Sequence, residues 1–173
     1  YGQFYILQQN YDASVPYLER ALELRLPKLM RNRAAFILGQ IHQRNGEFEQ
    51  ASVRYSYVVK NATTYDMEFN AKINLAQCYD ASTGDREFII KKLTRMIKDE
   101  KNKEFLDQIY YALAHVSMKD GDTATAIGFL KQSVTNSKTN NYQKAISSLE
   151  LADIFFNDKS EIILSILNCS SKS

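Results

Sequence analysis

Proline, glycine and tryptophan are scarce in this chain. Its 173 residues include two prolines, six glycines and no tryptophan. Because proline and glycine interrupt helices and mark turns, their scarcity favours long uninterrupted helices. The chain also lacks an uninterrupted apolar run of about 18 residues, the length that a membrane-spanning helix needs. Its 45% hydrophobic and 24% charged content are typical of a chain that folds around an apolar core.

Excess charge and clustered cysteines are missing as well. The formal net charge is +2, whereas nucleic-acid and anionic-lipid binders normally carry a concentrated basic stripe. Cys78 and Cys169 lie 91 residues apart with no His or Cys partner at metal-ligand spacing, so they indicate neither a disulfide framework nor a metal site. No nucleophile elbow, phosphate loop, zincin or dinucleotide fingerprint occurs. We therefore expect no catalysis and no cofactor.

Small residues, by contrast, recur at a nearly fixed interval. With steps of 37, 37, 38 and 38, a first series contains Gly2, Gly39, Ala76, Ala114 and Ala152. A second series, with steps of 37, 38 and 37, contains Ser14, Ala51 and Ala126, with the larger Ile89 at its third position. Two interleaved series with one period indicate a single supersecondary unit that is repeated about five times and buries its apolar face against its neighbours.

The repeat predicts an all-α fold. We expect one domain over residues 1–173, an α-solenoid with a right-handed superhelix, built from about four to five antiparallel helix pairs. The residues of the two series stand 12 positions apart in the first, second and fourth repeats and 13 apart in the third, so the two helices of a repeat are joined by a short turn and approach closely. The approximate bounds of the repeats are 1–27, 28–64, 65–102, 103–140 and 141–173.

The second and fourth repeats show the pattern most clearly. Apolar residues at steps of three and four predict helices over 29–44 and 47–60, separated by Asn45-Gly46. The fourth repeat predicts helices over 105–119 and 123–137, separated by Asp120-Gly121-Asp122, with Thr123 as the N-cap of the second.

These helix pairs resemble tetratricopeptide repeats. The segments that carry the resemblance are NYD at 10–12 with YLERALEL at 17–24, NGEFEQA at 45–51 with Tyr55, and Gly121-Asp122 followed by Ala126, Leu130 and Ser133. The family period is about 34 residues, so this chain has a surplus of about one helical turn per repeat. The surplus always lies between one repeat and the next, where an added turn keeps the apolar face aligned.

Two repeats depart from the pattern. In the third, Ile89 and Met96 stand where the family has small residues, and the turn at 80–85 is one residue longer. We therefore expect its second helix to lie further out or to be rotated. In the fifth, 145–156 predicts a first helix, but 160–167 predicts only a short second one before a polar tail.

A more specific resemblance lies in the middle and C-terminal repeats. YDMEFNAKINLA at 65–76, KDEKNKEFLDQIYYALA at 98–114 and GFLKQSV at 128–134 with QKA at 143–145 are similar to the large tetratricopeptide lipoproteins of the Bacteroidota type IX secretion and gliding-motility system. The resemblance implies a periplasmic, outer-membrane-associated scaffold. The chain begins inside an expected helix at Tyr1, which indicates a piece of a longer protein, so any lipid anchor would lie outside it.

The first helices of successive repeats line the concave side of such a solenoid, so their inward polar residues form the predicted groove for a protein or an extended peptide. Side-chain amides there can pair with the main chain of a peptide. The alternative is that the amides only solvate a helix face or brace neighbouring helices. The predicted groove residues are Arg33, Phe36, Gln40, Gln43, Arg44, Asn70, Asn74, Gln77, Gln108, Tyr111, His115 and Lys119.

Three other features are candidate sites, and each has a simpler structural interpretation or lacks the residues that the site needs. The carboxylate clamp of chaperone-binding tetratricopeptide domains needs Lys, Asn and Arg, and among the matching places only Asn74 fits, so we exclude that function. A basic run at 86–103 is interleaved with acidic residues and is typical of a solvated outer helix, although an acidic partner is the alternative. His42 and His115 are solitary, which favours structural roles over metal or acid–base chemistry.

The sequence therefore predicts a noncatalytic protein-binding scaffold without a bound metal. The alternative is the sensor or regulatory part of a cytoplasmic signalling or transcription protein, because such repeats often precede an effector domain. RNA binding by a related 35-residue helical repeat is disfavoured by the near-neutral charge and the longer period.

Overall fold

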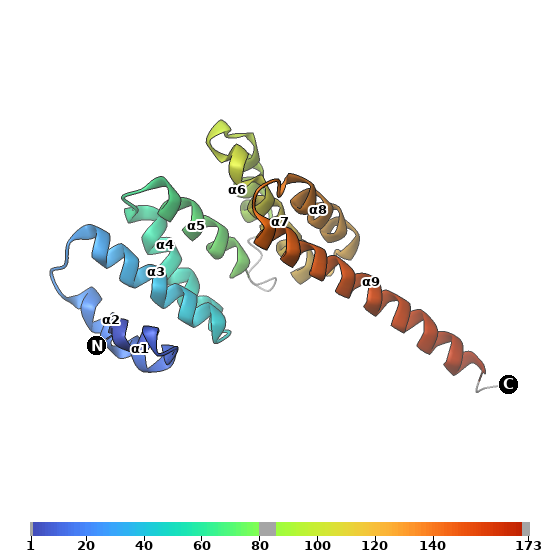
Figure 1. Ribbon diagram of the computed structural model, residues 1–173, viewed down its shortest axis with the longest axis horizontal. Coiled ribbons are helices and arrows are strands. Elements are labelled where there is room, and N and C mark those ends of the chain that lie inside the picture. Colours follow the sequence, from blue (N-terminus) through green and yellow to red (C-terminus); the bar gives the residue numbers. More distant parts are fainter. Residues whose placement is uncertain (1, 80–85, 171–173) are drawn as a thin grey trace. The chain divides into compact units, whose positions relative to one another are not determined.

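The computed structural model is helical, as the sequence predicts (Figure 1). It describes residues 2–79 and 86–170, with side chains described except at positions 3, 4 and 158–170. Nine α-helices and one 3-10 helix lie within these ranges, which contain no strand. The chain divides into two compact units, an N-terminal unit of residues 1–89 and a C-terminal unit of residues 90–173.

Five helices form the N-terminal unit, and each packs on the next in antiparallel order. Among its described residues, three small clusters contribute to its core: one joins α2 and α3 through Leu18 and Leu38, one joins α3, α4 and α5, and one surrounds Tyr55. The helices are α1 (Gly2–Leu7), α2 (Tyr11–Glu23), α3 (Lys28–Arg44), α4 (Phe48–Asn61) and α5 (Tyr65–Gln77).

The turns of the second and fourth helix pairs share one geometry. Gly46 and Gly121 have φ of 77° and 76°, the left-handed region that glycine enters without steric cost. After each, an N–H donates to a carbonyl five residues back, from Glu47 to His42 and from Asp122 to Ser117, which closes the end of the helix. These are the two breaks that the sequence predicts.

The predicted close approach of paired helices is confirmed at Gly39. A Cβ atom built on Gly39 would lie 2.7 Å from Cε1 of Tyr55, so only glycine leaves room for this ring. Ala76 and Ala114 of the same series are buried, and so are Ser14, Ala51 and Ala126 of the second series. Gly2 and Ile89 of the two series are half-buried, and Ala152 is exposed.

The C-terminal unit holds most of α6 and the helices that follow it. Its core cluster joins Ala114 of α7, Leu130 of α8 and Ile154 of α9. The 3-10 helix is anchored by Asn102, which is buried and donates to the Met96 carbonyl at 2.8 Å. The elements are α6 (Arg86–Lys98), η2 (Glu100–Phe105), α7 (Leu106–Lys119), α8 (Thr123–Asn136) and α9 (Asn141–Ser170).

Two local predictions are wrong. The fifth repeat is not a helix pair, because α9 runs without a break from Asn141 to Ser170. Thr123 is the first residue of α8 rather than its N-cap, and Asp122 takes that role by accepting a hydrogen bond from the Thr125 N–H at 3.1 Å. The longer turn predicted at 80–85 lies outside the described residues.

Candidate protein-binding surfaces

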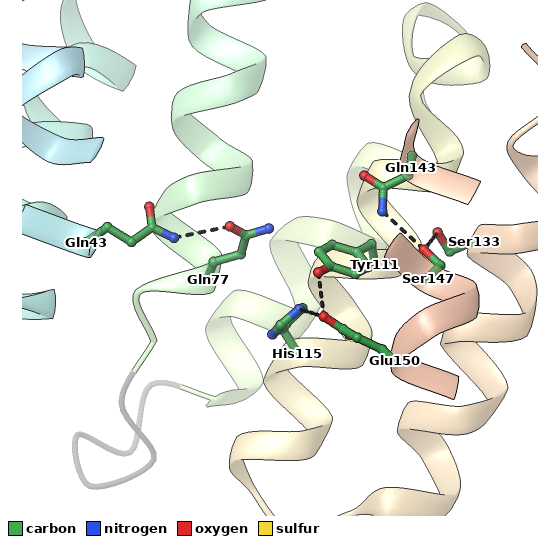
Figure 2. Close-up of polar contacts among 8 residues, drawn as sticks. All are labelled: Gln43, Gln77, Tyr111, His115, Ser133, Gln143, Ser147 and Glu150. Carbon is green, nitrogen blue, oxygen red and sulfur yellow. Dashed lines mark hydrogen bonds and ion pairs between the residues drawn. The ribbon is translucent and has the colours of Figure 1, made fainter. Parts of the chain in front are cut away.

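The predicted groove residues of the N-terminal unit lie on α3 and α5. Two of them are joined directly, because the Gln43 amide donates to the Gln77 carbonyl oxygen at 3.2 Å (Figure 2). The Tyr55 hydroxyl of α4 donates to the carbonyl oxygen of the same Gln43 at 2.7 Å. Gln43 therefore links three helices, and its amide braces the helical stack.

Tyr55 is the centre of this arrangement. It is fully buried, and burial raises its pKa well above the ordinary value. The nearby Cys78 adds to that increase, whereas a hydrogen bond with Asn74 opposes it. Phe36 packs edge-on against the same ring, with 5.6 Å between the two centroids. Phe36 and Asn74 thus also serve the contact between α3, α4 and α5.

Two further predicted groove residues, Arg44 and Asn70, contact residues of their own unit. The Arg44 guanidinium lies 4.5 Å from the centroid of the Tyr11 ring, a cation–π contact that joins α3 to α2. The Asn70 amide donates to the Asp66 carbonyl, one turn earlier in α5, at 2.8 Å. Arg33 and Gln40 are both exposed on α3. These two side chains are the members of the set best placed to meet a partner.

In the C-terminal unit, two predicted groove residues converge on a third side chain. The Tyr111 hydroxyl donates to Oε1 of Glu150 at 2.5 Å, and Nε2 of His115 lies 3.1 Å from the same oxygen (Figure 2). The Tyr111 and His115 rings also pack edge-to-face, with 4.5 Å between their centroids. This Tyr111–His115–Glu150 cluster joins α7 to α9.

The cluster is electrostatically coupled. Burial, the largest influence on Glu150, acts to raise its pKa, but hydrogen bonds from His115 and Tyr111 and the charge of His115 lower it below the ordinary value overall. The pKa of Tyr111 is raised, first by burial and then by its bond to Glu150. Glu150 therefore favours its charged form and Tyr111 its neutral form, the pairing that a hydroxyl-to-carboxylate hydrogen bond requires.

The other two predicted residues of α7 differ in exposure. Gln108 is half-buried near the start of the helix, and its N–H donates to the Asp107 carboxylate at 2.9 Å. Lys119 is exposed near the end. The structure therefore places Tyr111 and His115 together and leaves Gln108 and Lys119 outside the cluster.

Glu150 is not among the predicted groove residues, although its position in the repeat indicates the same helix face. It stands two positions before Ala152, as Asn74 stands two positions before Ala76. Glu150 therefore occupies in the fifth repeat the position that Asn74 occupies in the third, on the helix face of the predicted groove.

A buried hydroxyl network also went unpredicted. The Ser133 hydroxyl donates to the Asp107 carbonyl at 2.8 Å and lies 2.8 Å from the Ser147 hydroxyl, which accepts from the Gln143 amide at 3.1 Å (Figure 2). These groups join α7, α8 and α9 where water is excluded, so we assign them to stability.

The other residues that the sequence singles out, His42, Cys78 and the basic run, lie outside the predicted groove. Nδ1 of His42 lies 2.5 Å from a carboxylate oxygen of Glu47 across the turn between α3 and α4, and Cys78 is buried beside Tyr55. The four lysines and arginines at 91–98 in the basic run are exposed. Among the described residues, no group of three acidic, histidine or cysteine side chains could hold a metal ion. None of the described helices is both long and apolar enough to cross a membrane.

Comparison with known proteins supports the repeat interpretation at the N-terminus. A model of the tetratricopeptide repeat family matches residues 1–26, which include α1 and α2. A comparison with curated proteins finds none that matches the chain.

Proposed function

We propose that this chain is a noncatalytic scaffold that binds a protein or an extended peptide through the first-helix faces of its repeats. The observation that carries the proposal is the side-chain arrangement on α3. Gln43, Phe36 and Arg44 are held by contacts within the unit, whereas Arg33 and Gln40 are exposed beside them. A rigid face with a guanidinium and an amide directed to solvent suits recognition of peptide carbonyls and carboxylates.

The family match supports the same function. Repeated helix pairs form extended binding surfaces, and tetratricopeptide repeats are typically noncatalytic. Because the Gln43 and Gln77 amides join two helices and the Asn70 amide bonds within its own helix, the proposed surface is narrower than the predicted groove and centres on Arg33 and Gln40.

Affinity capture with matched variants tests this function. We expect Arg33→Ala with Gln40→Ala to lose proteins that the wild-type chain retains from an extract of the encoding organism. The control is Gln50→Ala with Lys60→Ala, which removes one exposed amide and one exposed cation from α4. Equal retention by both double variants, or no retained protein at all, would contradict the proposal.

We further propose that the scaffold acts in the periplasm, associated with the outer membrane and with secretion or motility machinery. The support is the resemblance of the segments at 65–76 and 98–114 to tetratricopeptide lipoproteins of that system. Fractionation of the full-length gene product tests the compartment, and we expect it in the outer-membrane fraction. A cytoplasmic product joined to a kinase or DNA-binding domain would instead establish the regulatory alternative.

A further inference from the structure

The structure divides the basic run at 86–103 into two parts that differ in charge. In η2, lysines are interleaved with acidic residues, and Lys103 forms an ion pair with Glu100. In α6, by contrast, five lysines and arginines stand with a single carboxylate, that of Glu87. The whole chain has a net charge of +2, so α6 carries more positive charge than the chain as a whole. The positive charge of the basic run is therefore concentrated on α6.

Three of these cations form one row along the outer side of α6. Lys91, Arg95 and Lys98 are separated by four and then three residues, the spacing that places side chains one above another on a helix. All three side chains are exposed. Leu93, on the opposite side of the helix, is 1% exposed and marks the inward face. We call Lys91, Arg95 and Lys98 the α6 row.

The α6 row lacks a neutralising partner within the part of the chain that the structure describes. No ion pair joins any of its three members to another described residue. Glu87 lies one turn before Lys91, and the Asp99 carboxylate, one turn after Arg95, accepts a hydrogen bond from the Lys101 N–H at 3.1 Å. Like charges at this spacing repel one another and destabilise a helix. An anion from outside the chain would relieve that repulsion.

We propose that the α6 row binds an acidic, extended segment of a partner protein. Along the helix axis its members lie about 6 Å and about 4.5 Å apart. Alternate side chains of an extended peptide lie about 6.6 Å apart on one face. Carboxylates at alternate positions of such a segment therefore meet successive cations, and the long lysine and arginine side chains cover the remaining difference.

The surroundings of the row favour this partner over others. A folded helix docks through an apolar stripe, but the exposed neighbours Lys92 and Thr94 are polar, and Phe88, one turn before Lys91, is a single apolar side chain. A membrane-binding helix inserts its apolar face, which in α6 holds the buried Leu93. Nucleic-acid binders contact about 6–10 phosphates, and the row has too few cations for that number.

An NMR titration of the isotope-labelled full chain tests the proposal. The probe is a short end-blocked peptide in which glutamate and serine alternate, and its control has glutamine in place of glutamate. We expect only the glutamate peptide to shift the amide signals of α6 in a saturable way. Raising the ionic strength from about 0.02 M to about 0.3 M should weaken this binding several-fold, because salt screens exposed charges.

Two triple variants with the same change in net charge assign the binding to the row. Replacing all three members of the α6 row with glutamine should weaken binding of the glutamate peptide by about fivefold or more. It should leave the melting temperature unchanged or higher, since it removes repulsion between like charges. The control, which should bind like the wild type, replaces three exposed lysines of the same unit: Lys131→Gln, Lys138→Gln and Lys144→Gln.

Three outcomes would overturn the proposal. They are an absence of α6 shifts with the glutamate peptide, equal weakening by both triple variants, and tighter binding of α6 to phosphatidylglycerol vesicles or single-stranded DNA than to the peptide. The result is separable from the proposed binding by α3. Arg33→Ala with Gln40→Ala should keep the α6 shifts, so either surface can fail its test without the other.

Discussion

Gly39 shows how one residue determines the packing of a helix pair. The ring of Tyr55 lies where a Cβ atom would be, and its hydroxyl is held by Gln43 at 2.7 Å. Because the ring is fully buried, it has no open space into which it could rotate. The side chain of position 39 and the position of α4 are therefore coupled.

We expect Gly39→Ala to lower the free energy of unfolding by about 1–3 kcal/mol through overpacking, and Gly39→Leu to lower it further. The matched control is Gly128→Ala in α8, where no heavy atom lies within 4 Å of the added Cβ. That substitution should raise stability by about 0.5–1 kcal/mol because alanine favours a helix interior. Urea titrations of the two variants measure both effects. Equal changes in the two variants would contradict the prediction that Tyr55 leaves no room for a Cβ atom at position 39.

Glu150 makes stability depend on acidic pH. Its folded-state pKa lies below its unfolded value, so the stability that its charged form contributes is complete above the ordinary value of 4.5. That contribution is lost as the pH falls through the folded value. We expect Glu150→Gln to be less stable than the wild type at neutral pH and to lose less stability on acidification, by melting curves at both pH values.

The exposed Glu104→Gln variant is the control for this measurement, and its acid response should match the wild type. A wild-type response from Glu150→Gln as well would place the acid sensitivity elsewhere in the chain.

At the scale of the element, the glycines in the turns between paired helices give the most direct test of local structure. We expect Gly46→Ala and Gly121→Ala each to reduce the free energy of unfolding by about 1 kcal/mol, because a residue with a Cβ atom resists the left-handed conformation. No atom lies within 4 Å of the added Cβ in either case, so the loss would report backbone strain alone. Chemical denaturation measures it, and unchanged midpoints would show that another residue type suits these turns equally well.

Local patterns are sufficient to predict most of these elements. The paired helices of the second and fourth repeats begin and end within one or two residues of their predicted bounds, because glycine at a left-handed position and apolar spacing are local signals. The helix break predicted after Phe156 is wrong because the local signals that end a helix are absent there. That segment is polar but contains neither glycine nor proline, so nothing in it opposes a continued helix.

The candidate surfaces are less predictable from the sequence. Helical projection places Gln43, Gln77, Tyr111 and His115 on the equivalent face of the first helix in each of their repeats. It does not reveal that Gln43 bonds to Gln77 or that Tyr111 bonds to Glu150, because these partners lie 34 and 39 residues away. Whether an amide braces a neighbour or stays open to a ligand is decided by packing between helices.

At the scale of the whole molecule, the chain consists of two compact units with separate cores. The core clusters of the N-terminal unit are built from residues between Ile6 and Cys78, and the cluster around Leu130 is built within the C-terminal unit. Within the N-terminal unit, α1 to α5 each pack on their sequence neighbours, and within the C-terminal unit α8 packs on α7 and α9. Stability should therefore be local to each unit.

We expect a fragment of residues 1–79 to fold alone, with helical circular dichroism and a cooperative thermal transition. The reason is that its apolar clusters need no residue from the C-terminal unit. In that fragment, Gly39→Ala should lower the melting temperature as it does in the full chain. A fragment that is unfolded at room temperature would show that the two units depend on each other.

The most direct test of a protein-binding role is the affinity of a captured partner for two double variants, measured by isothermal titration calorimetry. We predict that Arg33→Ala with Gln40→Ala raises the dissociation constant at least tenfold, whereas Gln50→Ala with Lys60→Ala changes it less than about twofold. Equal affinity for both variants, or a greater loss from the α4 pair, would contradict the assignment of binding to the first-helix face.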